Sequence, residues 1–150
     1  MVILDYKLAE EKIKKIILKG TNVLANIIYF LHKNFNHYNW VGIYIVQDDN
    51  LILKAWKGKQ ATEHTKIPIG KGICGLAAAS GKTEIVDDVT TDKRYLSCFV
   101  STKSEIVVPI KKEKKVLGEI DIDSDKKNAF SKKDKIFLEN LADMLCEHIH

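Results

Sequence analysis

The stretch SEIVVPIKKEKKVLGEIDIDS, residues 104–124, contains the two clearest strand signals of the chain. Residues 105–110 and 116–122 are rich in β-branched side chains, and the lysine-rich segment 111–115 between them is typical of a solvated hairpin turn. On the second strand Asp121 and Asp123 project from one face, about 6.5–7 Å apart. With Glu105 they form an acidic stripe that could bind a cationic ligand, although a solvent-exposed strand gives the same alternation.

Helical periodicity lies on both sides of this stretch. Residues 5–35 repeat apolar side chains at helical spacing, and Gly20 followed by Thr21 divides them into two helices or bends one, with Thr21 available as a cap. Ser131 and Asp134 have the spacing of a capping box and open a last amphipathic helix. The element order predicts an α+β fold, with the terminal helices together on one face of an antiparallel sheet.

The segments between these elements are shorter. Residues 40–46 and 51–56 are β-rich runs around a polar turn, residues 58–71 form a polar connection, and residues 70–81 contain a small-residue helix. A brief strand is expected at 84–86, followed by a long loop over 87–101, and long loops inside compact domains are often functional. With 150 residues, 45% of them hydrophobic, we expect one domain spanning 1–150.

Composition excludes several classes of protein. The net charge of +4 comes from lysines spread along the chain, and no aromatic residues interleave with the cluster at 111–115, so nucleic-acid binding is not expected. The longest apolar stretch, residues 23–31, is too short to span a membrane, and no signal peptide is visible. We expect a cytoplasmic protein whose three cysteines are reduced thiols or a catalytic redox set.

Two of the cysteines lie in segments that suit chemistry. Cys98 lies in the long loop without an obvious packing role, and is either a nucleophile that ends as a sulfenic acid or a buried structural residue. Cys74 stands between glycines at the start of the small helix, where a helix N-terminus lowers a thiol pKa. It is the natural thiol to resolve a sulfenic acid as a disulfide, although a small residue at a tight turn fits equally well.

The strings Ser-Glu-Ile-Val-Val-Pro and Asp-Ile-Asp-Ser, together with Gly72-Ile73-Cys74-Gly75, resemble the GAF-domain enzymes that reduce free methionine-(R)-sulfoxide. The resemblance extends from Trp40 to the C-terminus. It implies a GAF-like fold and an oxidoreductase in which Cys98, seven residues before Glu105, attacks the sulfoxide sulfur. A thioredoxin-type reductant would regenerate the thiols, and neither a metal nor a cofactor is expected.

The same resemblance assigns the substrate-binding residues. Glu105, Asp121 and Asp123 match the acidic residues that hold the substrate ammonium group in those enzymes. Trp40 and Tyr44 match residues that line the pocket for the methyl and thioether groups, and their four-residue spacing on a strand puts both rings on one face. Core packing alone would also account for the two aromatic rings.

Three positions depart from the family pattern. His64 occupies the place of a cysteine that is often the main resolving thiol, and is interpreted as an exposed loop residue or as a proton donor. Phe99 replaces the usual Asp after Cys98, and Glu119 replaces an aliphatic residue and is expected at a solvated edge. The alternative function is therefore a non-catalytic GAF module that binds small molecules or senses redox state.

The C-terminal end of the chain is expected to take no part in the chemistry. Cys146, His148 and His150 lie in the last helical turn, where two histidines two residues apart do not share a helix face well enough for a metal site. We interpret Cys146 as a spectator. The surplus apolar positions of the terminal helices would suit a homodimer, but burial against the sheet also explains them.

Overall fold

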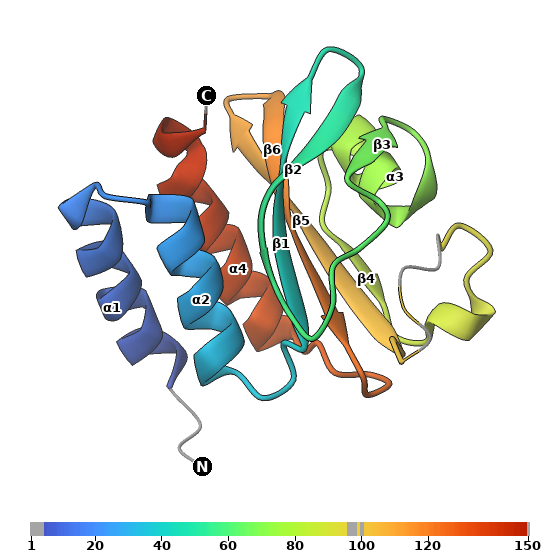
Figure 1. The fold of residues 1–150 in the computed structure, drawn as a ribbon, viewed down its shortest axis with the longest axis horizontal. Coiled ribbons are helices and arrows are strands. Elements are labelled where there is room, and N and C mark those ends of the chain that lie inside the picture. Colours follow the sequence, from blue (N-terminus) through green and yellow to red (C-terminus); the bar gives the residue numbers. More distant parts are fainter. Residues whose placement is uncertain (1–4, 96–98, 100, 150) are drawn as a thin grey trace.

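An antiparallel sheet forms the centre of the structure, a computed structural model in which residues 5–95, 99 and 101–149 are described (Figure 1). Within those residues the sheet has six strands in the order β3-β2-β1-β6-β5-β4. Every neighbouring pair is antiparallel. The strands are β1 (Trp40–Gln47), β2 (Asn50–Lys57), β3 (Lys66–Pro68), β4 (Glu84–Val86), β5 (Ser104–Lys112) and β6 (Lys115–Ser124).

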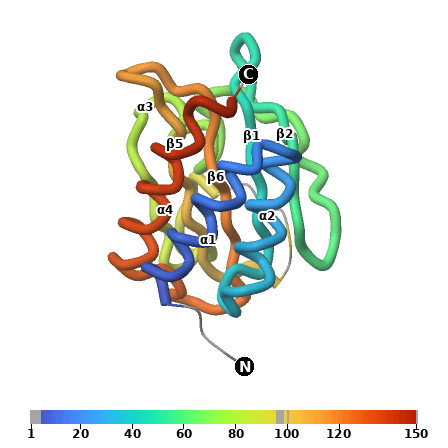
Figure 2. The backbone as a smooth tube through the Cα atoms, turned by 90° about the vertical axis from the view of Figure 1, so that its left-hand side faces the viewer, coloured from blue at the N-terminus to red at the C-terminus, as the bar shows by residue number. Residues whose placement is uncertain are grey.

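Helices cover both faces of the sheet. They are α1 (Tyr6–Lys19), α2 (Val23–Asn34), α3 (Gly72–Ser80) and α4 (Lys132–Leu145), with short 3₁₀ turns at Val89–Thr91 and Cys146–His148. The helices α2 and α4 pack against one face, and α1 lies over these two helices on the side away from the sheet (Figures 1 and 2). The opposite face carries α3. The predicted α+β class and the placement of the terminal helices are therefore confirmed.

Local sequence explains the helix boundaries. Gly20 adopts the left-handed conformation at φ 70° and its N–H donates to the carbonyl of Ile17 at 3.0 Å, which ends α1. The residue before α2 is Asn22, also left-handed, and not Thr21, so the expected threonine cap is wrong. Ser131 and Asp134 form the predicted capping box at the start of α4.

Alternation along the central strands creates two hydrophobic layers. The even-numbered side chains of β5 and β6, such as Ile106 and Ile122, join the larger core beneath the helices α2 and α4. The odd-numbered side chains of β5 and β6 face α3. There Val107 of β5 joins Trp40 and Tyr44 of β1 in a smaller apolar cluster. On β5 and β6, an even residue number therefore places a side chain in the larger core, and an odd number places it on the face that carries α3.

Two segments differ from expectation. Residues 66–68, predicted as part of a connection, form β3, because Ile67 is buried and pairs with Leu51 of β2. The loop predicted over 87–101 contains the short turn Val89–Thr91, where the Asp88 side chain accepts a hydrogen bond from the Thr90 N–H at 3.0 Å.

Of the helices formed by residues 5–95 and 101–149, none combines the length and apolar composition that a membrane crossing requires.

Candidate functional site

The strands β5 and β6 place four carboxyl groups on the face that carries α3. Glu105 comes from β5, and Glu119, Asp121 and Asp123 come from β6; none is more than 3% exposed. Asp123 lies between Trp40 of β1 and Glu105 of β5 in the sheet register. The predicted acidic stripe is therefore buried, and the alternative of a solvent-exposed strand is wrong. These four residues are called the acidic cluster below.

Glu119 is fully buried, so its expected place at a solvated edge is wrong. The strand β6 lies in the middle of the sheet, and Glu119 is flanked by Tyr44 on β1 and Pro109 on β5. Neither of its carboxyl oxygens has a hydrogen-bond partner among the described residues. Burial raises the pKa of Glu119 well above its ordinary value, and the negative charge of Asp121 adds to this effect.

The thiol of Cys74 faces the acidic cluster from the first turn of α3. Its Sγ lies 3.3 Å from Oδ2 of Asp121 and 4.0 Å from Oε2 of Glu105. The glycine that follows permits this approach, because a Cβ at Gly75 would lie 2.7 Å from the carbonyl oxygen of Pro68. The sequence Gly-Ile-Cys-Gly thus packs the start of α3 against β3 and points the cysteine at the carboxylates.

The surroundings of Cys74 oppose its ionisation. Burial raises the pKa of the Cys74 thiol well above its ordinary value, and the neighbouring carboxylates, led by Asp121, raise it further. The helix N-terminus was expected to lower this pKa, but burial beside several carboxyl groups outweighs the helix dipole. In the unliganded protein Cys74 therefore holds its proton and can donate it to Asp121.

Several oxygens of the two aspartates in the acidic cluster lack the partners that buried carboxylates normally have. Among the described residues, Oδ1 of Asp121 and both carboxyl oxygens of Asp123 accept no hydrogen bond. Burial raises the pKa of each of these two aspartates. Because an uncompensated buried carboxylate is costly, the arrangement favours either protonation or the entry of a cation that donates hydrogen bonds.

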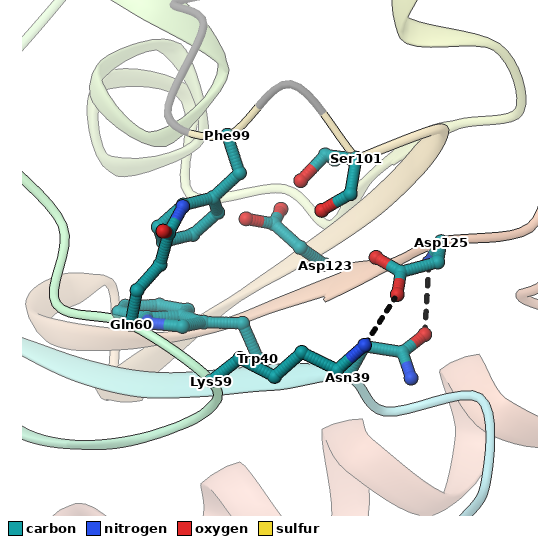
Figure 3. A pocket seen from close by; sticks show the side chains of 9 residues that line it. Asn39, Trp40, Lys59, Gln60, Phe99, Ser101, Asp123 and Asp125 are labelled. Carbon is teal, nitrogen blue, oxygen red and sulfur yellow. Dashed lines mark hydrogen bonds and ion pairs between the residues drawn. The ribbon is translucent and has the colours of Figure 1, made fainter.

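A pocket of about 190 Å³ opens beside Asp123, which points into it (Figure 3). The ring of Trp40 forms one wall and the ring of Phe99 another, with their centroids 5.9 Å apart. Around them lie mainly polar side chains, those of Asn39, Lys59, Gln60, Ser101, Thr102 and Asp125. The pocket therefore offers an aromatic wall next to a carboxylate that belongs to the acidic cluster.

The two predicted aromatic residues lie on the same face, but they have different surroundings. Trp40 lines the pocket, whereas Tyr44 is not among the described residues that do so. The hydroxyl of Tyr44 donates a hydrogen bond to the carbonyl oxygen of His64 at 2.7 Å and so holds the segment before β3. His64 is half-buried, not exposed as expected, and its positive charge would lower the pKa of Asp121.

Of the other two cysteines, Cys98 and Cys146, the structure describes only Cys146. Cys98, the predicted nucleophile, lies outside the described residues, although its neighbour Phe99 is described and is buried against the pocket. Cys146 is partly buried and packs against the core on the helix side of the sheet. Cys74 lies on the opposite side, so these two thiols are separated by the sheet.

Sequence reasoning missed two contributors to the site. Phe99 was noted only as a departure from a family pattern, and its position next to Cys98 was the available signal that it lies near the chemistry. Asp125 continues the odd-numbered acidic series of β6 beyond the strand. Its backbone N–H donates to Oδ1 of Asn39 at 2.8 Å, and its carboxylate lies 3.9 Å from Nζ of Lys59 (Figure 3).

The sequence and the fold match known proteins. The GAF domain family matches residues 21–149, which defines the class of the protein. The type II free methionine-R-sulfoxide reductase of Thermoplasma acidophilum is 38% identical with a TM-score of 0.84, over 90% of this chain and 95% of that one. The fRMsr of Staphylococcus aureus, solved in complex with substrate, is 34% identical with a TM-score of 0.87 over the whole of both chains.

A sequence relative agrees with these structures. The free methionine-R-sulfoxide reductase of Escherichia coli (strain K12) is 34% identical over 122 residues, which are 81% of this chain and 73% of that protein. The chain thus belongs to the GAF domain family, in which it is closely related to the free methionine-R-sulfoxide reductases.

Proposed function

We propose that this protein reduces free methionine-(R)-sulfoxide to methionine. The observation that carries the proposal is the approach of Cys74 to within 3.3 Å of Asp121, inside a buried acidic cluster that adjoins an aromatic pocket. Its relatives include free methionine-R-sulfoxide reductases, one of them solved in complex with substrate. The family and the chemistry of the site therefore point to the same substrate.

Each part of the substrate has a complementary group. The ammonium group of a free amino acid can donate hydrogen bonds to Glu105, Asp121 and Asp123, and charge-assisted bonds of this kind contribute about 1.5–3 kcal/mol each. The rings of Trp40 and Phe99 suit the methyl and thioether groups. Tyr44 contributes indirectly, by fixing the segment that contains His64.

The proposed reaction uses Cys98 and Cys74 in turn. The thiolate of Cys98 attacks the sulfoxide sulfur, and the sulfoxide oxygen passes to Cys98 with the uptake of one proton from solvent, which gives bound methionine and a Cys98 sulfenic acid. The Cys74 thiol then attacks the sulfenic sulfur, which releases water and forms a Cys74–Cys98 disulfide. A thioredoxin-type dithiol reduces this disulfide, so that each turnover consumes two reducing equivalents.

Binding of the substrate in the acidic cluster should also change the ionisation of the Cys74 thiol. In the unliganded site the carboxylates disfavour the Cys74 thiolate, as described above. A bound ammonium group brings one positive charge into this buried space, and a nearby opposite charge favours ionisation of the thiol. We infer that the ammonium group, which stays in the site while the product methionine is still bound, prepares Cys74 for the resolving step.

The proposed reaction requires a reducing compartment. Cys74 and Cys146 are free thiols, which suits a reducing cytoplasm with a thioredoxin-type system. We propose that residues 1–150 act as one GAF domain without a cofactor. A homodimer through the exposed surface of the terminal helices remains a prediction.

Loss of one carboxylate tests the recognition of the ammonium group. The substitutions Glu105→Gln and Asp123→Asn should each weaken binding of free methionine sulfoxide by about tenfold or more, because a neutral amide cannot balance the ammonium charge. Asp143→Asn is the matched control, since Asp143 is exposed on α4, on the side of the sheet away from the acidic cluster. Binding can be measured by calorimetric titration.

The same titration with a blocked dipeptide that contains methionine sulfoxide tests whether binding requires the free ammonium group of the amino acid. The dipeptide has an uncharged amide in place of the ammonium group and should bind poorly. The alternative is a non-catalytic module that binds small molecules or senses redox state. It would be favoured if the free amino acid and the dipeptide bind with equal affinity, or if neither Glu105→Gln nor Asp123→Asn changes the affinity. His64 in place of a family thiol and Phe99 after Cys98 are the residues that favour this alternative.

A further inference from the structure

Cys74, Glu105 and Asp121 bring together one sulfur and two carboxylate oxygens, all within 4.8 Å of one another. The measured separations from Sγ are 3.3 Å to Oδ2 of Asp121 and 4.0 Å to Oε2 of Glu105. A tetrahedral zinc ion with its usual bond lengths holds a sulfur and an oxygen ligand about 3.6 Å apart. The two separations lie on either side of this value, so small side-chain movements would bring all three atoms into coordination.

A second observation points to a cation at this place. Oδ1 of Asp121 and both oxygens of Glu119 are buried, and they accept no hydrogen bond from the described residues. None of the lysine or arginine ion pairs formed by the described residues reaches Glu119, Asp121 or Asp123. These three buried oxygens therefore lack a hydrogen-bond donor among the described residues, and a cation bound beside them would compensate for this.

We propose that Cys74, Glu105 and Asp121 form a binding site for a thiophilic divalent cation of the zinc and cadmium class. Thiolate is a soft ligand that selects such metals, whereas Mg²⁺ and Ca²⁺ require oxygen ligands in larger number. As the metal–sulfur bond forms, the Cys74 thiol loses its proton to solvent. Water would occupy the remaining coordination position.

The site has a consequence for activity that rests on the proposed function. A bound cation would occupy the position of the substrate ammonium group and would hold the thiol that resolves the sulfenic acid. Zn²⁺ should therefore inhibit reduction reversibly and compete with free methionine sulfoxide. A chelator should restore activity without any change in the covalent state of the protein.

Cadmium binding provides a direct test, because a cadmium–thiolate bond has a charge-transfer absorption. The protein for this test is the full chain with Cys98→Ser and Cys146→Ser, in which Cys74 is the remaining cysteine. We expect one Cd²⁺ per chain with the release of a proton, displacement by Zn²⁺, and no displacement by Mg²⁺. Free methionine should weaken Cd²⁺ binding, and N-acetylmethionine, which lacks the ammonium group, should not.

Two further substitutions in this background locate the metal. Asp121→Asn should weaken Cd²⁺ binding by at least tenfold, whereas Asp143→Asn, at an exposed position on α4, should leave it unchanged. If Asp121→Asn does not fold, as judged by circular dichroism, Glu105→Gln takes its place with the same expectation. Failure to observe the cadmium–thiolate band, or equal Cd²⁺ affinity with and without the cluster carboxylate, would overturn the proposal. This readout does not need catalysis, so a failure of the proposed function would leave it intact.

Discussion

Cys74 is buried among carboxyl groups, which keep its thiol protonated and slow to react with oxidants. In the proposed reaction its single task is to resolve the sulfenic acid formed at Cys98. The substitution Cys74→Ser should therefore permit one turnover and then allow the sulfenic acid to persist. Dimedone labelling after substrate addition should detect this species at Cys98.

Cys146→Ser is the matched control for this experiment, since Cys146 lies on the helix side of the sheet. It should change neither the labelling nor the rate of turnover. If Cys74→Ser gives no labelled product and keeps its full turnover rate with a thioredoxin system, another group resolves the sulfenic acid.

Trp40 depends on glycines for its position. A Cβ at Gly42 or at Gly58 would overlap the Trp40 ring, so both positions leave room for the wall of the pocket. We expect Gly42→Ala to displace the ring, to destabilise the protein by about 1–3 kcal/mol and to weaken ligand binding. Urea unfolding and ligand titration measure the two effects.

A second substitution shows whether the ring is the cause. Trp40→Phe reduces the ring, so the double variant Gly42→Ala with Trp40→Phe should be more stable than the sum of the single effects predicts. Purely additive losses would mean that the alanine acts through the strand and not through Trp40.

At the scale of elements, Asp134 ties the start of α4 to α1 and to the chain before β1. Its Oδ1 accepts hydrogen bonds from the hydroxyls of Tyr6 at 2.9 Å and Tyr38 at 2.6 Å, and it lies 2.8 Å from Nε2 of His37. Burial alone would raise the pKa of Asp134, but the bonds from His37 and Tyr38 outweigh it and hold the pKa well below its ordinary value.

This lowered pKa predicts how stability depends on pH. A carboxyl group with a pKa lower in the folded state than in the unfolded state stabilises the fold above its unfolded value, which is about 3.9. That contribution disappears as the pH falls from about 5 through the folded pKa. Asp134→Asn should therefore reduce the free energy of unfolding near neutral pH by about 3 kcal/mol or more, and should reduce its dependence on acid pH.

Asp143→Asn is the matched control, because Asp143 lies on the same helix and is exposed. It should leave the free energy of unfolding at neutral pH nearly unchanged. An Asp134→Asn protein with the stability and the acid profile of the native chain would contradict the assignment of this network.

The sequence predicted those elements whose signals are local. The alternation in β5 and β6, the helix break at Gly20 and the capping box at Ser131 each depend on signals within a few residues of the chain. The strand β3 was not predicted, because it has three residues, includes a proline and forms only through pairing with β2. The burial of Glu119 was also missed, since a strand covered by α3 and a strand facing water show the same alternation.

At the scale of the whole molecule, the sheet separates two tasks. The helices α2 and α4 bury one face, and together with α1 they supply much of the hydrophobic core (Figures 1 and 2). The other face carries α3, the acidic cluster and the pocket. The sequence could predict the candidate residues on this face from their resemblance to a family, but not the high pKa of Cys74 or its approach to Asp121, because both depend on how α3 packs.

A single-turnover experiment tests the central claim most directly. Fully reduced protein is mixed with one equivalent of free methionine-(R)-sulfoxide without an external reductant, and methionine, free thiols and disulfide-linked peptides are measured. We predict one methionine per chain, the loss of two thiols and a disulfide between Cys74 and Cys98, with no methionine from Cys98→Ser. Unchanged thiols with no methionine formed, or a Cys98→Ser protein that turns over at the native rate, would contradict the account.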